Sequence, residues 1–194
     1  PADELDKIKS GISDSIENAG YSKWIPTVGP QEEAFNSKAD CMLFGGEPGG
    51  GKTALAVGLA FTSHKRSLIL RRQYTDLSGI IDYAIQVNGS KVGFNGQPPP
   101  RLQISKDQFI DFGGCNKIGD EMHWRGRPHD LIVFDEGTQF AYSQVRFLMG
   151  WNRQEDPNQR CRVMIQTNPP LTTEGWWVVK MFAPWLDDRY PNPA

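Results

Sequence analysis

The chain has 194 residues, of which 38% are hydrophobic, with a formal net charge of −2 and a mean hydropathy of −0.51. These values exclude a surface coated in positive charge, and no apolar stretch approaches the roughly 20 residues of a membrane span. Cys41, Cys115 and Cys161 lie far apart without C-x-x-C spacing, which argues against a disulfide framework or a zinc site. Since residues 1–4 also lack signal-peptide character, we expect one soluble intracellular domain.

The first predicted element is an amphipathic helix over residues 1–20. Leu5, Ile8, Ile12 and Ile16 are spaced three and four apart among polar residues, which places one apolar stripe along a helix. We expect this peripheral helix either to pack on the main core or to serve as an arm that binds a partner.

Strands and helices then alternate along the chain. In order, we expect a helix at 32–35, a strand at 41–44, a helix from 52 to about 63, a strand at 67–71 and a helix at 77–87. Two short strands at 101–105 and 108–112 could form a hairpin at the sheet edge, followed by a strand at 131–135, a helix at 140–151 and a strand at 162–166. Because the longer strands are apolar without alternation, this order predicts an α/β fold with a mainly parallel sheet and helices on both faces.

The most specific motif fits G-x-x-x-x-G-K-[ST] between a predicted strand and a predicted helix. Its residues are Gly46, Glu47, Pro48, Gly49, Gly50, Gly51, Lys52 and Thr53. In such a P-loop the backbone N–H groups surround nucleotide phosphates, Lys52 adds positive charge, and the Thr53 hydroxyl completes the shell of a Mg²⁺ ion. The sequence therefore predicts a site for nucleotide phosphates and Mg²⁺.

Two further pairs of polar residues directly follow predicted strands. Asp135 suits a carboxylate that stabilises the metal, and Glu136 can orient and deprotonate a water molecule for in-line attack on the γ-phosphate. Thr167 and Asn168 follow the next core strand, so both pairs should meet the P-loop at one edge of the sheet. The alternatives are a solvated acidic pair and an ordinary Asn-Pro turn.

Together these motifs resemble the N-terminal ATPase domain of the large terminase subunit, the DNA-packaging motor of tailed bacteriophages. Gln31 matches the family's adenine-recognition glutamine, residues 131–136 match its Walker B strand with a catalytic glutamate, and residues 166–169 match its coupling motif. The resemblance extends from Gln31 to Asn168. The family often has an arginine in the P-loop, where this chain has Glu47-Pro48.

The resemblance implies a P-loop NTPase of the additional-strand, catalytic-glutamate class. In that class the strand carrying Thr167 lies between the P-loop strand and the Walker B strand, and Thr167 and Asn168 sense the γ-phosphate. Lys52 and Glu136 would be catalytic. ATP would also contact Gln31 and the P-loop, and Mg²⁺ would be held by Thr53 and Asp135.

Arginines provide the candidates for a finger that acts on the nucleotide of a neighbouring subunit. Arg125 precedes the Walker B strand where the family carries an Arg-Gly pair, so we choose it as the catalytic finger, with Arg127 as the competing choice. A solvent-facing or cis-acting Arg125 is the alternative. Arg71 and Arg72 resemble another family pair and could contact phosphate or DNA, or pair with surface carboxylates.

For the whole protein, the resemblance implies a ring of identical subunits that drives double-stranded DNA into the procapsid. Its partners would be DNA, the portal protein and the small terminase subunit, in the host cell cytoplasm without a membrane, and it would be absent from the mature virion. Lys65 and Arg66 are further candidates for DNA phosphate contacts. We expect residues 31–170 to form the core and 171–194 a C-terminal extension, without the acidic site of a two-metal nuclease.

Three other functions share parts of this pattern. A helicase-like P-loop DNA ATPase would have the same P-loop and Asp-Glu pair. A small-molecule kinase would need an arginine-rich lid and no water-activating glutamate, and a nucleotide-binding switch or scaffold would hold ATP without turnover. The presence of Glu136 argues against the kinase and against the switch.

Overall fold

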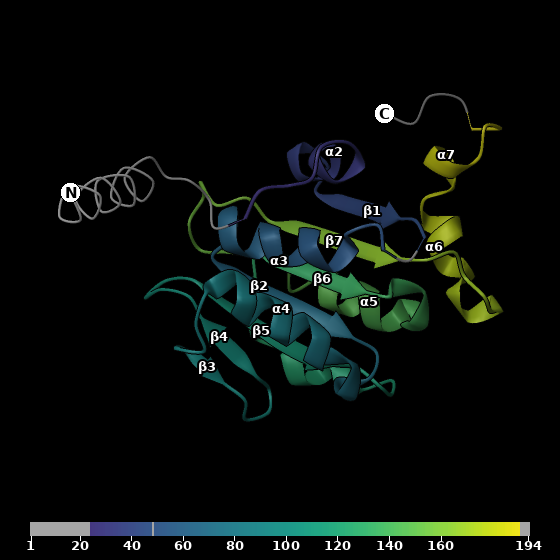
Figure 1. Ribbon diagram of the computed structural model, residues 1–194. Coiled ribbons are helices and arrows are strands. Elements are labelled where there is room, and N and C mark those ends of the chain that lie inside the picture. The colour runs from purple at the N-terminus through teal and green to yellow at the C-terminus, as the bar shows by residue number, and fades with distance from the viewer. Residues whose placement is uncertain (1–23, 48, 191–194) are drawn as a thin grey trace, which may run out of the picture.

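A computed structural model describes residues 24–47 and 49–190 of the chain (Figure 1). Pro48 and the helix predicted over residues 1–20 lie outside the described residues. The described residues form one seven-stranded sheet with helices on both of its faces (Figure 1).

The strands are β1 (Cys41–Gly45), β2 (Arg66–Arg71), β3 (Phe94–Asn95), β4 (Arg101–Gln103), β5 (Phe109–Gly114), β6 (Leu131–Asp135) and β7 (Arg162–Thr167). The helices are α2 (Pro30–Asn36), α3 (Lys52–Thr62), α4 (Ser78–Asn88), α5 (Tyr142–Met149), α6 (Trp176–Met181) and α7 (Ala183–Leu186). Four 3₁₀ helices span Tyr74–Leu77, Asp120–Trp124, Gly137–Gln139 and Thr173–Gly175. Of the helices described, none is both long and apolar enough to cross a bilayer.

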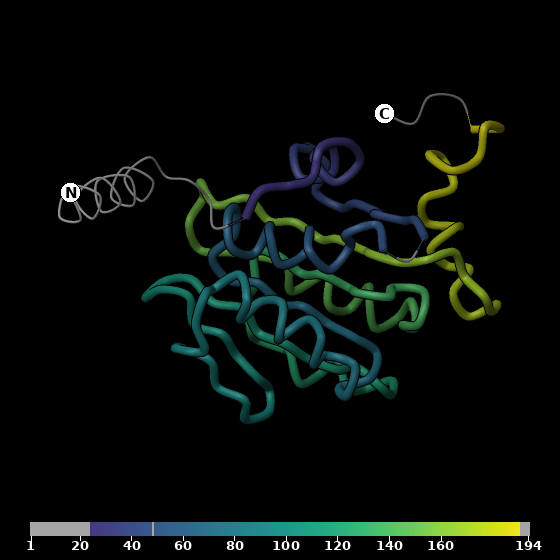
Figure 2. The backbone as a smooth tube through the Cα atoms, viewed as in Figure 1, coloured from purple at the N-terminus to yellow at the C-terminus, as the bar shows by residue number. Residues whose placement is uncertain are grey.

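The strand order is β1-β7-β6-β2-β5-β4-β3. The five strands from β1 to β5 in this order are parallel, and β4 and β3 are antiparallel additions at one edge. This arrangement confirms the predicted α/β class and the placement of β7 between the P-loop strand and the Walker B strand. The parallel strands point the same way, so the chain leaves them at the same end of the sheet (Figure 2).

The predicted hairpin is formed by β4 and β5, but it does not lie wholly at the edge. β5 pairs in antiparallel register with β4 and in parallel register with β2, so β5 is an interior strand and only β4 and β3 extend the sheet outward. Its apolar residues explain this position, because Ile110 and Phe112 are both fully buried in the cluster on the α3 and α4 face.

Alternation along the strands divides the core between the two faces. On one face α3 and α4 pack against side chains that include Ile69, Val133 and Met164. On the other face α5 and α6 pack against side chains that include Leu68, Leu70, Ile132, Phe134 and Ile165. Burying one such side chain contributes roughly 1.5–3 kcal/mol, so each buried strand anchors its carboxyl end firmly.

The segment after β7 belongs in part to this core. Val178 of α6 and Phe182 are buried in the cluster on the α5 face. Residues 173–186, which the sequence assigns to a C-terminal extension, therefore cover the sheet near β7, and we expect their packing to support the loop that follows β7.

Candidate nucleotide site

A cavity of about 350 Å³ opens at the carboxyl edge of the sheet. Its lining residues are Gly49, Gly50, Gly51, Lys52, Thr53, Ala54, Arg71, Asp135, Glu136 and Asn168. They come from the loop after β1 and the start of α3, and from the ends of β2, β6 and β7. The structure thus brings together the three distant segments that the sequence predicts to converge.

The P-loop has the backbone of an anion-binding turn. Gly49 and Gly51 have φ angles of +89° and +71°, a left-handed region that favours glycine. Gly51 is also the N-cap of α3, whose first backbone N–H groups and helix dipole favour negative charge at this point. These features favour the binding of phosphate oxygens at the start of α3.

Lys52 connects the P-loop to the end of β7. Its ammonium group donates hydrogen bonds to the carbonyl oxygens of Gly46 and Glu47, both at 2.9 Å, and to Asn168 Oδ1 at 2.8 Å. These three bonds use the three donors of the ammonium group. A phosphate oxygen that entered the cavity would compete for a donor that Asn168 holds, which links phosphate binding to the end of β7.

Gln31 lies against the P-loop but does not line the cavity. This side chain is buried; its Nε2 donates to the Gly51 carbonyl at 2.9 Å, and its Oε1 accepts from the Thr27 N–H at 2.6 Å. The buried Arg162 guanidinium fixes α2 by donating to the carbonyl of Ala34 at 2.9 Å. Through its own two hydrogen bonds Gln31 stabilises the start of α3. Recognition of adenine by the second N–H of its amide stays a prediction.

Arg71 binds the carboxylates of both Asp135 and Glu136. Its Nε and Nη2 each lie 2.8 Å from Asp135 Oδ2, and its Nη1 lies 3.4 Å from Glu136 Oε1. Gln139 also donates to the Glu136 carboxylate. Of the three roles that the sequence leaves open for Arg71, the structure shows pairing with carboxylates, but inside the cavity and not on an outer surface.

Glu136 is the one non-glycine residue with positive φ among the residues described, at φ 56° and ψ 49°. Holding a side chain in this left-handed region costs about 1–3 kcal/mol, which surrounding structure must offset. Here the turn directs the carboxylate into the cavity immediately after the buried strand β6. Such backbone strain is typical of functional residues.

The residues around the cavity fit a magnesium ion held together with a nucleotide. The Thr53 hydroxyl and the buried Asp135 carboxylate line the same cavity and are oxygen ligands of the kind that Mg²⁺ prefers. Within the described residues, no group of three or more His, Cys, Asp or Glu side chains could hold a metal ion.

Hydrogen bonds join the end of β7 to both halves of the site. Gln166 donates through Nε2 to the Lys52 carbonyl, and the Thr167 hydroxyl lies 2.8 Å from the Thr138 hydroxyl, two residues after Glu136. Gln166 was predicted only as part of the coupling motif, without a contact to the nucleotide, and Thr138 was not predicted. The signal for Gln166 was a polar residue within an otherwise apolar strand, whereas nothing in the sequence pointed to Thr138.

The remaining arginines differ in how the protein uses them. Arg72 donates to the backbone carbonyls of Asn116 and Gln139, so it holds two loops together. Arg127 lies with its Cζ 5.7 Å from the centroid of the Trp124 ring. Arg125, the predicted finger, is exposed and does not line its own molecule's cavity.

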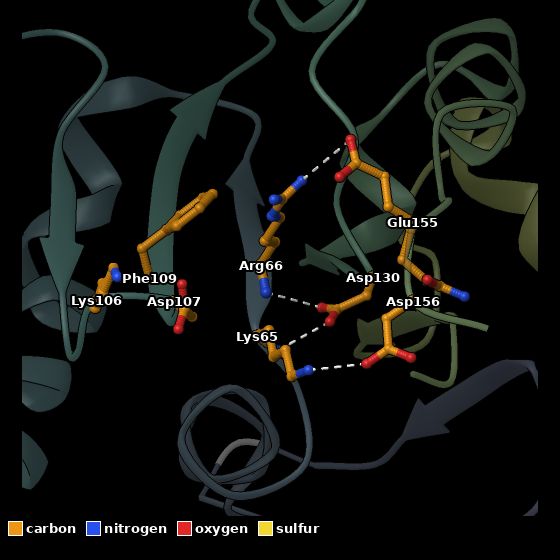
Figure 3. A pocket seen from close by; sticks show the side chains of 9 residues that line it. Lys65, Arg66, Lys106, Asp107, Phe109, Asp130, Glu155 and Asp156 are labelled. Carbon is orange, nitrogen blue, oxygen red and sulfur yellow. Dashed lines mark hydrogen bonds and ion pairs between the residues drawn. The ribbon is translucent and has the colours of Figure 1, made fainter. Parts of the chain in front are cut away.

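Lys65 and Arg66, predicted to contact DNA, lie at the opposite edge of the sheet beside a cavity of about 270 Å³ (Figure 3). Lys65 Nζ lies 3.0 Å from Asp156 Oδ2, and Arg66 Nη1 lies 3.9 Å from Glu155 Oε1. The buried Asp130 carboxylate accepts hydrogen bonds from the backbone N–H groups of both basic residues. Carboxylates therefore offset the positive charge at this edge, and a DNA contact by these residues stays a prediction.

No protein-family model and no curated protein matches the chain. Solved structures do match. The large terminase of the thermophilic bacteriophage D6E superimposes with a TM-score of 0.61 at 13% identity, over 86% of this chain and 44% of that chain. The HK97 bacteriophage large terminase gives 0.57 at 10% identity, over 86% and 38%, and a D6E large terminase in complex with ADP gives 0.52 at 14% identity, over 72% and 38%.

This chain therefore spans about two fifths of the length of these large terminases. The superpositions establish the fold, whereas identities this low leave the residues of the site to be argued from their own geometry. The α/β P-loop architecture with its mostly parallel sheet is the fold found in phage large terminases.

Proposed function

We propose that the chain is the ATP-hydrolysing motor domain of a phage large terminase, and that hydrolysis drives double-stranded DNA into the procapsid. The observation that carries the proposal is the meeting of Lys52, Asp135, Glu136 and Asn168, from three distant segments, at one cavity beside the start of α3. The fold likeness to large terminases, one of them in complex with ADP, supports a nucleotide as the ligand.

In this proposal the β- and γ-phosphates bind against the P-loop N–H groups and Lys52. Thr53 and Asp135 would hold Mg²⁺, which when bound would neutralise part of the phosphate charge. Glu136 accepts a proton from a water molecule, whose oxygen attacks the γ-phosphorus in line, and the bond to the β–γ bridging oxygen breaks with its electron pair leaving on ADP. The strained Glu136 backbone supports this role, because it aims the carboxylate at the cavity.

The Arg71 contacts suggest how the site is kept inactive before nucleotide binds. The guanidinium neutralises the same two carboxylates that metal binding and water activation require. Since Arg71 also lines the cavity, it can turn from these carboxylates toward a phosphate oxygen when ATP binds. Glu136 would then be free to act as the base.

Arg125 would complete the site in a neighbouring copy. Its exposure and its position outside its own cavity support a role in trans, where a guanidinium would stabilise charge on the transferring phosphoryl group. Activity would then require a ring of copies. That ring would work on the portal protein with the small terminase subunit, in the host cytoplasm.

The test is the ATPase rate per subunit as a function of protein concentration, with and without double-stranded DNA. We expect the specific rate to rise with concentration, to increase with DNA, and to vanish in Glu136→Gln. Arg125→Ala should lower the rate at every concentration, and mixing it with Glu136→Gln chains should restore part of it. A rate that is absent, or that is flat with concentration and unaffected by Glu136→Gln, would instead indicate a monomeric switch or scaffold.

A further inference from the structure

A second cavity, of about 390 Å³, lies at the carboxyl end of β5. Its lining residues are Tyr74, Pro98, Pro99, Gly113, Gly114, His123, Trp124 and Arg127, and we call it the aromatic slot. It adjoins the nucleotide site, because Gly114 pairs with Arg71 in the register of β5 and β2. The slot is apolar in its walls and basic at its rim.

Two glycines allow Trp124 and Tyr74 to pack closely against β5. A Cβ on Gly113 would come within 2.1 Å of the Trp124 ring, and a Cβ on Gly114 would come within 3.1 Å of the Tyr74 backbone nitrogen. Because Gly113 has no side chain, the indole ring of Trp124 packs directly against β5. An apolar side chain that entered the slot would therefore meet Tyr74 and the two prolines around a rigid floor.

A matching apolar projection lies on the other side of the nucleotide site. Leu171 is 99% exposed, the highest value among the large hydrophobic residues described, and it follows Pro169 and Pro170. It helps to line a cavity of about 340 Å³ that also contains Glu136. The two prolines restrict the backbone before Leu171, so little conformational entropy would be lost if this side chain became buried in a partner.

In the structure the projection does not contact the slot of its own molecule, because Leu171 is almost fully exposed and is not among the residues that line the slot. Leu171 follows β7 and the slot lies at β5, with β6 and β2 between them. Three strand spacings separate β7 from β5 by roughly 14 Å. A contact between Leu171 and the slot is therefore a head-to-tail contact between two copies, which is the kind of interface that closes into a ring.

We propose that Leu171 of one copy docks into the aromatic slot of the next copy in the ring. The inference rests on the proposed function, because trans catalysis must bring the Arg125 segment of one copy to the Glu136 cavity of its neighbour. Arg125 directly follows Trp124 of the slot wall and precedes Arg127 of the rim, and Leu171 lines the cavity of Glu136. Docking of Leu171 thus brings Arg125 to the neighbour's cavity, where the γ-phosphate of its nucleotide would bind.

Disulfide formation between two different single variants tests the contact. Chains carrying Leu171→Cys are mixed with chains carrying Tyr74→Cys, both with Cys41 and Cys161 replaced by serine, under mild oxidation. The buried Cys115 stays unreactive because burial, together with nearby Glu121 and Asp120, raises the pKa of its thiol to about 12. We expect a covalent dimer in the mixture, and little in a matched mixture of Tyr74→Cys with Val92→Cys, whose valine is 79% exposed elsewhere.

A second measurement separates failure of the docking from failure of the proposed function. Because burial of a leucine changes association by about tenfold or more, Leu171→Asp should raise by that factor the concentration that gives half-maximal ATPase rate. Val92→Asp should shift it less than about twofold. Concentration-dependent hydrolysis without the cross-link would overturn the docking alone, whereas the cross-link without any hydrolysis would support the docking and overturn the function.

Two further variants, Tyr74→Ala and Trp124→Ala, test nucleic acid as the occupant of the slot. If Tyr74→Ala and Trp124→Ala weakened binding of a single-stranded oligonucleotide while assembly was unchanged, the slot would be a base-stacking site and the docking would be wrong.

Discussion

Two charged cavities lie at opposite ends of the parallel strands, one at the amino ends, which we call the amino edge, and one at the carboxyl ends, the carboxyl edge. They use similar residues differently. At the amino edge, Asp130 accepts the backbone N–H groups of Lys65 and Arg66, whose charged ends pair with outer carboxylates (Figure 3). At the carboxyl edge, Arg71 and Glu136 face a cavity that also holds the P-loop. Charges at the amino edge fasten loops together, whereas those at the carboxyl edge are kept available to a ligand.

The two ends of β2 show the difference most directly. Arg66 begins the strand and makes one ion pair at 3.9 Å with an exposed glutamate, whereas Arg71 ends it with two contacts of 2.8 Å to a buried aspartate. The carboxyl end is also where the strained Glu136 lies. Short contacts to buried carboxylates, next to backbone strain, distinguish the candidate site from an ordinary charged surface.

The largest effect should come from Glu136→Gln, which keeps the shape of the side chain but removes the base. We expect the hydrolysis rate to fall by about 10²–10⁴-fold while nucleotide binding is retained. Single-turnover hydrolysis and titration with a fluorescent ATP analogue measure the two quantities separately. Equal loss of binding and turnover would mean that Glu136 supports the structure of the site and not the chemistry.

At the amino edge, Asp130→Ala should affect stability and not chemistry. It leaves two backbone N–H groups without their acceptor, at a cost of about 2–4 kcal/mol in the free energy of unfolding. Urea unfolding measures this loss, and Asp107→Ala, at an exposed aspartate of the same cavity, is the matched control. A change in the ATPase rate per folded molecule beyond about twofold would break the distinction between the two edges.

The arginines of β2 give a matched pair for the comparison. Arg71→Ala leaves the buried Asp135 carboxylate unpaired, so we expect a loss of about 2–3 kcal/mol, less than for a fully enclosed pair because the cavity reaches the carboxylate. Arg66→Ala should cost less than about 0.5 kcal/mol. Thermal unfolding of both variants checks the difference, and equal losses would contradict it.

The smallest effect should be a pH dependence at Asp111. Burial alone would raise the pKa of this carboxyl, but hydrogen bonds from His129 and Arg101 outweigh it and hold the pKa below the ordinary value of 3.8. The stabilising contribution is therefore present above that value and is lost as pH falls through the lower folded pKa. The stability difference between the native chain and Asp111→Asn should stay constant above this value and shrink as pH falls below 3.8, and a constant difference there would argue against this linkage.

Most of the fold could be predicted because its signals are local. Apolar runs identified β1, β2, β6 and β7 to within a residue or two, and each lies in the fully parallel part of the sheet. The interior position of β5 was not predicted, because a short strand in a Gly/Pro-rich region carries no signal for its second neighbour. Only the pairing of β5 with β2, from a distant part of the chain, decides that position.

The sequence by itself determined where the glycine-rich turn before α3 and the Asp135-Glu136 pair at the end of β6 lie. Both are sets of consecutive residues, and local rules govern a glycine turn before a helix and carboxylates at the end of an apolar strand. Only the tertiary structure decided the different roles of Arg71 and Arg72. Neighbouring residues at a strand end point to opposite sides, and Asp135 and Gln139, which bind them, lie more than sixty residues away along the chain.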